Sequence, residues 1–187
     1  MAQAAETAER LAGLRREIAA LEGRPAATLR LEAEVEAQAR DDVLPFGVEA
    51  VDRRLGGGGL ALGALHEIAC DESREAGAVT GVCVALLARL LAERPGRVLW
   101  ITTAEARREA GRLDGPGLVA LGLDPGRLVE VRAERPEEAL WAFEEGLSCR
   151  GTAAVVAEVP GRPAVLDLTA TRRLALRAGG GRGSEAG

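Results

Sequence analysis

The chain has 187 residues, of which 47% are apolar, so it can form one globular domain with a sizeable core and flanking tails. Its net charge of −5 produces no overall positive potential that would attract nucleic acid. Three cysteines without a CxxC pair, beside the single histidine His66, predict buried free thiols in a reducing cytoplasm and no metal site. The polar N-terminus has no apolar leader and no uncharged apolar stretch reaches 18 residues, so neither secretion nor a membrane span is predicted.

The first part of the chain, residues 1–42, is predicted to be an N-terminal amphipathic helical segment. Residues 5–22 carry an a/d seam of apolar side chains and end at the glycine and proline of 23–25; a second helix is predicted over 28–40. The seam packs either on its own domain or on a partner or second copy, and both readings stay open. Its members are Leu11, Leu14, Ile18 and Leu21.

The globular core is predicted over 43–178, with a short helix at 48–55 and a glycine-rich turn at 56–59. A buried strand at 64–70, a polar loop at 71–76 and a long apolar helix at 77–92 then follow. His66, on the predicted strand, is interpreted as a packed structural histidine. Strand, loop and helix in this order form the setting in which a P-loop holds phosphate on backbone N–H groups.

The P-loop pattern itself fails in this loop. Cys70 stands where the first glycine is required, and Ala78 follows Gly77 where the lysine is required. All 24 basic residues are arginines, so shifting the P-loop pattern along the chain cannot supply the missing lysine ammonium group. The loop residues Asp71, Glu72, Ser73, Arg74 and Glu75 bring three carboxylates that would repel a triphosphate. The sequence therefore predicts a degenerate phosphate loop, no nucleotide cofactor, and a structural role or an acidic contact surface for this segment.

The rest of the core repeats strands and helices. Strands are predicted at 97–102, 127–132 and 152–159, and helices after Thr102 and at 118–123, 136–147 and 169–178. In the helix at 136–147, Leu140, Phe143 and Leu147 are predicted to share the buried face. The glycines and proline of 115–117 are predicted to break the chain, 165–168 to be extended, Thr169 to cap the last helix, and 179–187 to be a disordered Gly-rich tail. This order predicts an α/β fold with a mostly parallel sheet flanked by helices.

The chain resembles the cores of RecA-like ATPases in LPFGVEAVDRRLGGGGLALGALHEIAC, at 44–70, and in VVAEVP, at 155–160. It is more closely similar to the inducible mutagenesis protein A (ImuA) family in DESREAGA, PGLVALGLDP, RPEEALWAFEEGL and LDLTATRRLAL. The resemblance spans roughly residues 5–178; such proteins are usually longer, with a further C-terminal portion. It implies a RecA-like fold and a role in SOS-induced, error-prone translesion synthesis. The implied partners are an ImuB-like polymerase homologue and an error-prone polymerase alpha subunit; RecA and a second copy of the chain are further candidate partners.

The same resemblance places the Walker A lysine on or beside Ala78 and the Mg²⁺-binding residue of the Walker B strand near Glu158. Glu158 is interpreted as a strand-end carboxylate, because no lysine or following hydroxyl holds a phosphate for it to bridge. The leading hypothesis is a non-catalytic, cytoplasmic accessory protein that acts through protein contacts. The alternatives are an ATPase that uses Arg74 in place of lysine, a SulA-like inhibitor of cell division, and weak, salt-sensitive DNA contact. The DNA alternative rests on Arg172, Arg173 and Arg177.

Overall fold

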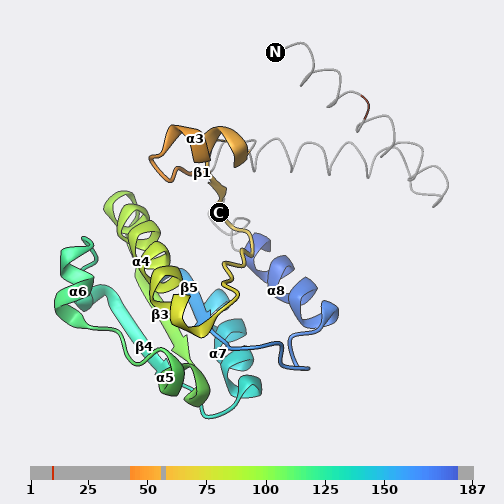
Figure 1. Ribbon diagram of the computed structural model, residues 1–187. Helices are drawn as coiled ribbons and strands as arrows, with labels where there is room; N and C mark the ends of the chain where they lie inside the picture. Colours follow the sequence, from red (N-terminus) through yellow and green to blue (C-terminus); the bar gives the residue numbers. More distant parts are fainter. Residues whose placement is uncertain (1–9, 11–42, 56–57, 181–187) are drawn as a thin grey trace. The chain divides into compact units, whose positions relative to one another are not determined.

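A computed structural model describes residues 10, 43–55 and 58–180, which divide into two compact units (Figure 1). The smaller unit contains 43–45 and 50–62. Its strands β1 (Val43–Leu44) and β2 (Leu60–Ala61) pair antiparallel, with Leu44 opposite Leu60. Between them in the chain come α3 (Glu49–Asp52) and a 3-10 turn, Arg53–Leu55. The predicted short helix at 48–55 is thus confirmed, whereas the two short strands were not predicted.

The larger unit contains 46–49 and 63–180 and is built on a three-stranded parallel sheet in the order β4-β3-β5. The strands are β3 (Arg97–Thr102), β4 (Leu128–Arg132) and β5 (Thr152–Glu158). The central strand β3 is the most deeply buried, with Val98, Trp100 and Ile101 fully enclosed. The register places Trp100 between Glu130 of β4 and Val156 of β5. The predicted α/β class and parallel sheet are therefore confirmed, with strand ends within one residue of the prediction.

Helices cover both faces of this sheet. Helix α7 (Pro136–Ser148) packs on one face, where Ala139 and Ala142 contact Ile101, and α8 (Leu168–Gly180) packs against α7 through Leu140 and Leu174. Helix α4 (Ala76–Glu93) lies on the other side of the sheet, as Figure 1 shows. The short helices α5 (Ala104–Glu109) and α6 (Gly115–Ala120) connect β3 to β4.

Among the described helices, α4 with the turn before it (Ser73–Glu93) has the length and apolar composition that would allow it to cross a membrane. Core helices of water-soluble proteins have the same composition. Helix α4 buries five side chains: Val84, Leu86, Leu87, Leu90 and Leu91. Its first half is more open, since Gly77, Ala78 and Val82 are exposed.

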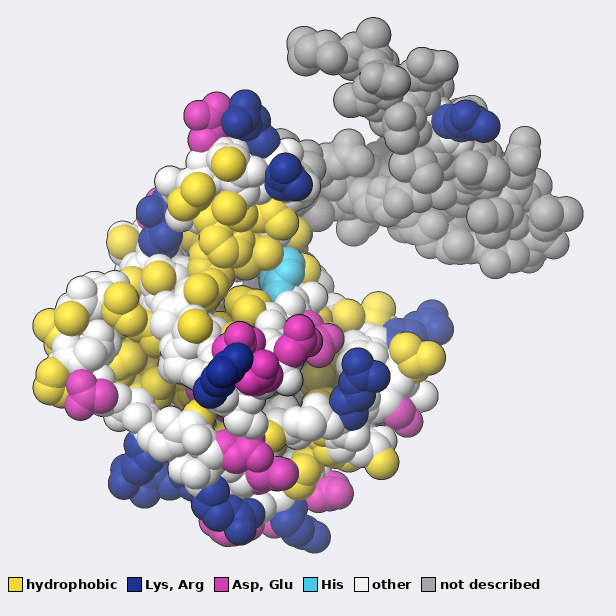
Figure 2. Space-filling view, in the orientation of Figure 1, with side chains coloured by type: hydrophobic (Ala, Val, Ile, Leu, Met, Phe, Trp, Pro, Cys, Tyr) yellow, Lys and Arg dark blue, Asp and Glu magenta, His cyan; other side chains and the backbone are white. Residues whose placement is uncertain are grey.

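The predicted strand at 64–70 is wrong. These residues follow a turn and form no strand, and within the described part of the chain no sheet partner joins them. Leu65 packs beside the cluster of Leu140 and Leu174, but Ile68 is 39% exposed. The apolar composition was read correctly, but a strand also needs a neighbour at hydrogen-bonding distance. His66 is likewise exposed, as the cyan patch of Figure 2 shows, and is not a packed core histidine.

Side-chain caps account for two further corrections. The Asp114 carboxylate accepts the N–H of Gly117 (2.8 Å), so the glycines and proline of 115–117 begin α6 instead of breaking the chain. Asp167, not Thr169, caps α8 by accepting the N–H of Ala170 (2.7 Å). The predicted extended piece at 165–168 is consequently a turn into α8, and this helix runs to Gly180, two residues beyond its predicted end.

Candidate functional site

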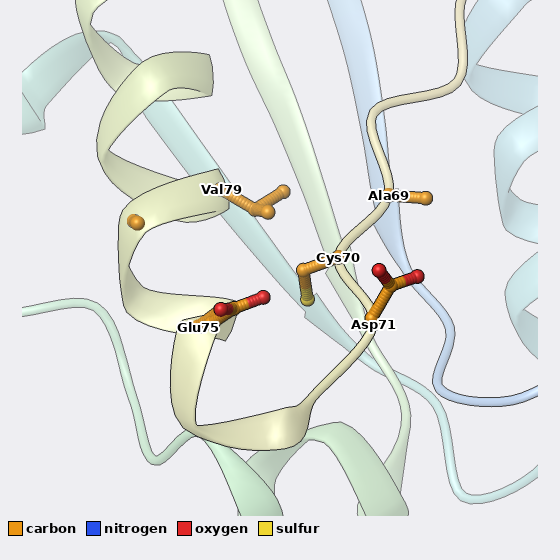
Figure 3. A pocket seen from close by; sticks show the side chains of 6 residues that line it. Ala69, Cys70, Asp71, Glu75 and Val79 are labelled. Atoms are coloured by element: carbon orange, nitrogen blue, oxygen red, sulfur yellow. The ribbon is translucent and has the colours of Figure 1, made fainter.

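The predicted phosphate-loop positions gather at the N-terminal end of α4. Cys70 and Asp71 end the irregular segment, Glu72 begins a 3-10 turn (Ser73–Glu75), and Gly77 and Ala78 lie in the first turn of α4. Together with Ala69, Glu75 and Val79, three of them (Cys70, Asp71 and Ala78) line an open hollow of about 410 Å³. Figure 3 shows the side chains of Cys70, Glu75 and Val79 facing the space between loop and helix. Those of Ala69 and Asp71 point away from α4 in the same view.

The charge around this hollow is unfavourable for phosphate. The loop carries three carboxylates, and Arg74 is held by one of them: its Nε lies 2.7 Å from Oε2 of Glu72, and its Nη2 donates to Oε1 at 3.1 Å. Arg74 is the residue that the ATPase alternative needs in place of lysine. Its exposed guanidinium is already paired with Glu72 in its own turn, so the positive charge that it could offer a phosphate is partly neutralised.

The loop is also tied to the neighbouring helix α5. The hydroxyl of Ser73 donates to Oε2 of Glu109 at 3.1 Å. This contact brings a further carboxylate close to the turn that a P-loop would devote to phosphate. The loop therefore binds its own protein's side chains and adds negative charge at the position where an anion would have to sit.

Glu158 ends β5 and faces the first turns of α4. The hydroxyl of Thr80 donates to Oε1 of Glu158 at 2.9 Å, in a half-buried setting. Glu158 is thus the last residue of β5, an outer strand of the described sheet, and it has a hydrogen-bond partner on α4. The sequence did not predict this pair, because Thr80 and Glu158 are 78 positions apart and their contact depends on the packing of α4 against β5.

The thiols near this site differ in their surroundings. Burial raises the pKa of Cys83, and the negative charge of Glu158 raises it further, so this half-buried thiol stays protonated at neutral pH. Cys70 is exposed on the wall of the hollow, and Cys149 is exposed at the end of α7, which corrects the prediction that the thiols are buried. A hydrogen bond from the backbone of Gly151, and a second one from the side chain of Thr152, lower the pKa of Cys149.

No group of three or more His, Cys, Asp or Glu side chains suited to a metal ion occurs in the described ranges 43–55 and 58–180. The arrangement at the end of α4 is a hydrogen-bonded junction between loop, helix and sheet, lined by carboxylates and small apolar side chains.

The predicted partner and DNA contacts lie elsewhere. The seam residues Leu11, Leu14, Ile18 and Leu21 fall outside the described residues. On α8, the carboxylate of Glu144 from α7 accepts hydrogen bonds from Arg173, with Nε at 2.7 Å, and lies 3.5 Å from Nη2 of Arg177. All three arginines are exposed, and two of them, Arg173 and Arg177, hold α8 against α7.

Sequence reasoning missed the outward face of α8. Leu168 and Leu176 are 89% and 69% exposed, and they lie four residues to either side of Arg172, so all three share one helix face. Large apolar side chains exposed to this extent mark candidate protein contacts. The signal was present in LDLTATRRLALR as an i, i+4, i+8 pattern, but the buried leucine of the same helix, Leu174, obscured it.

Comparisons with known proteins give one consistent relationship. The chain is 42% identical over 136 residues to Protein ImuA of Caulobacter vibrioides, in both strain NA1000 / CB15N and strain ATCC 19089 / CIP 103742 / CB 15. The aligned region is 72% of this chain and 52% of each relative. The chain therefore spans about half the length of the curated relatives it matches. No protein-family model matches the chain.

Proposed function

Because this chain belongs to the ImuA family, we propose that it is a non-catalytic, RecA-like accessory protein of damage-induced mutagenesis. In this proposal it works in the cytoplasm within a translesion-synthesis complex, through contacts with an ImuB-like polymerase homologue, an error-prone polymerase alpha subunit, RecA or a second copy. It uses no nucleotide or metal cofactor, and any DNA contact is weak or indirect.

The loop before α4 supports the proposal most directly, because it has the position of a phosphate loop but not the side chains that bind phosphate. The loop keeps its place between an apolar segment and a long helix that covers a parallel sheet. The chain has no lysine, the loop's one arginine is paired with Glu72, and Ser73 donates to Glu109. A phosphate at this helix N-terminus would meet the three loop carboxylates and an arginine that is already paired with one of them, which supports a role without P-loop catalysis.

The outward face of α8 is the surface that we assign to partner binding. Leu168, Arg172 and Leu176 form an exposed apolar and basic strip on a helix whose opposite side is fixed to α7 by Leu174 and Arg173. A rigid helix that presents two leucines around one cation suits an apolar groove with an acidic rim on a partner.

The test is capture of purified ImuB-like protein, polymerase alpha subunit and RecA from the same organism by the tagged chain. We expect direct binding of at least one of them. The double variant Leu168→Ser with Leu176→Ser should weaken capture at least roughly tenfold, because burying a leucine side chain contributes about 1.5–3 kcal/mol. The matched control changes two exposed residues near α6, Val119→Ser with Leu121→Ser, and should bind like the unchanged chain. Equal binding by both double variants would rule out the α8 face, and binding to none of the three proteins would contradict the accessory role.

A further inference from the structure

Helix α7 has a third side, which faces neither the sheet nor α8, and it carries an exposed tryptophan. Ala142 and Gly146 lie against the sheet and Leu140 lies against α8, whereas Trp141 is 66% exposed. The other tryptophan of the chain, Trp100, is fully buried in β3. Tryptophan has a large apolar surface and is enriched among the residues that dominate binding at protein interfaces. Trp141 is therefore a candidate anchor for another protein.

Two glutamates flank Trp141 on the same side of the helix. Glu137 lies four residues before it and Glu145 lies four residues after it, so the three side chains share one helix face. Both glutamates are exposed. These three residues form what we call the α7 face. Its chemistry is opposite to that of the strip on α8, where two leucines surround a cation.

The carboxylates of the α7 face are not engaged by the described part of the chain. The helix has four glutamates, and the other two are paired: Glu138 with Arg135 at 3.0 Å, and Glu144 with Arg173. Among the described residues, the side chains of the two glutamates on the α7 face make neither an ion pair nor a hydrogen bond. Negative charge is thus left free on either side of Trp141.

An indole ring between two free carboxylates has the chemistry of a site for a cation. The face of a tryptophan ring attracts an Arg or Lys side chain that lies over it. Arginine suits this arrangement best, because its planar guanidinium stacks on the ring and can also donate hydrogen bonds to a carboxylate. The methylene groups of the same arginine would cover part of the exposed ring and remove it from water.

We propose that the α7 face docks an arginine from an exposed segment of a protein partner. The inference rests on the proposed function, in which the chain acts through protein contacts, and it adds a second contact surface to the strip on α8. Burial of Trp141 supplies most of the affinity. Glu137 and Glu145 supply an attraction that speeds association and weakens as salt is added.

The first test asks whether Trp141 is accessible in the free chain. Trp141→Phe leaves Trp100 as the single tryptophan, so the fluorescence lost in this variant is the signal of Trp141. Acrylamide should quench that signal nearly as readily as it quenches tryptophan amide in solution, whereas Trp100 should resist the quencher. If Trp141 were as protected as Trp100, the proposal would be overturned, because another segment or a second copy would already occupy the α7 face.

The second test identifies the docked group. Overlapping short peptides that cover the ImuB-like protein, the polymerase alpha subunit and RecA are immobilised and probed with the chain. We expect the bound peptides to contain arginine, and replacement of that arginine by citrulline, which keeps the shape but not the charge, should weaken binding at least about tenfold. Raising the salt from about 50 mM to about 500 mM should weaken it further. Binding that survives citrulline, or the absence of any arginine-dependent peptide, would overturn the proposal.

Variants of the chain locate the site. Trp141→Ala should weaken binding of the arginine peptide at least about tenfold, with the unfolding transition left in place because the side chain is largely exposed. Glu137→Gln with Glu145→Gln should remove most of the salt dependence. The matched control, Glu93→Gln with Glu105→Gln, removes the same charge from two other exposed glutamates and should bind like the unchanged chain. Equal losses in both glutamate variants would indicate general charge attraction and contradict the α7 face.

Capture of the whole partner proteins separates this inference from the proposed function. If Trp141→Ala captures them as well as the unchanged chain does, the α7 face is wrong and the accessory role stands. If the unchanged chain captures none of them, the accessory role is wrong and this inference fails with it. Leu168→Ser with Leu176→Ser should leave the arginine peptide bound, because those leucines belong to the strip on α8.

Discussion

Gly146 is the position at which α7 comes closest to the sheet, and its replacement tests that packing. A β-carbon at residue 146 would lie 2.6 Å from Cδ2 of Leu99 and 3.0 Å from Cγ2 of Val155. Both distances are shorter than van der Waals contact, so in Gly146→Ala either the helix or the two strands must move. Overpacking of this kind costs about 1–3 kcal/mol, and the higher helix propensity of alanine returns about 1 kcal/mol. We expect Gly146→Ala to lower the free energy of unfolding by about 1 kcal/mol, and Gly146→Val to lower it further.

The matched control for this prediction is Gly81→Ala in α4. A β-carbon at residue 81 would meet no atom within 4 Å, so only the helix propensity changes and the variant should be more stable by about 1 kcal/mol. Urea unfolding followed by far-UV circular dichroism measures both changes. If Gly146→Ala stabilised the protein as much as Gly81→Ala, α7 would not lie against β3 and β5 at the described distance.

Three further predictions concern charged side chains that make hydrogen bonds or ion pairs. Arg127 donates to the carbonyl oxygens of Leu91 (2.6 Å), Arg94 (2.7 Å) and Gly96 (2.9 Å), so Arg127→Ala should lower the free energy of unfolding by about 2 kcal/mol; a loss below about 0.5 kcal/mol in urea unfolding would contradict this role. A hydrogen bond from Arg132 and the nearby arginine charges hold the pKa of Glu130 below its ordinary value of 4.5. Because the pKa of Glu130 is lower in the folded than in the unfolded protein, its contribution to the free energy of unfolding is complete above pH 4.5 and is lost as the pH falls through the folded pKa. The free energy of unfolding, measured across the acid range, should therefore fall less steeply with acid in Glu130→Gln than in the unchanged chain. Glu144→Ala removes the α7 partner of Arg173, so it should loosen α8 from α7 and raise amide exchange in α8 more than in α7; equal exchange in both helices would argue against that ion pair as the anchor.

Much of the fold was readable from the sequence because buried runs have a distinctive composition. The strands β3, β4 and β5 are short apolar segments between glycine, proline or acidic turns, and each was predicted within one residue of its observed ends. Helix α7 was equally clear from Pro136 at its first position and the acidic residues that follow. In these cases local sequence and tertiary packing favour the same structure.

The segment 64–70 marks the limit of that reasoning. Its apolar residues suit a strand, yet whether a strand forms depends on which segment lies beside it, and composition does not carry that information. The same limit applies to the site. The missing lysine and the acidic loop could be read directly, but the pairing of Thr80 with Glu158 joins residues that only the packing of α4 on the sheet brings together. The caps at Asp114 and Asp167 were readable in principle, since each aspartate accepts an N–H three residues ahead.

The central claim is that the loop before α4 holds no nucleotide, and calorimetric titration of the full chain with ATP and Mg²⁺ tests it most directly. With a RecA protein as positive control in the same buffer, we expect no heat of binding for this chain up to about 1 mM ATP, a limit that corresponds to a binding free energy of about −4 kcal/mol. A dissociation constant in the micromolar range, lost in Arg74→Ala, would contradict the account and favour an ATPase that uses arginine in place of lysine.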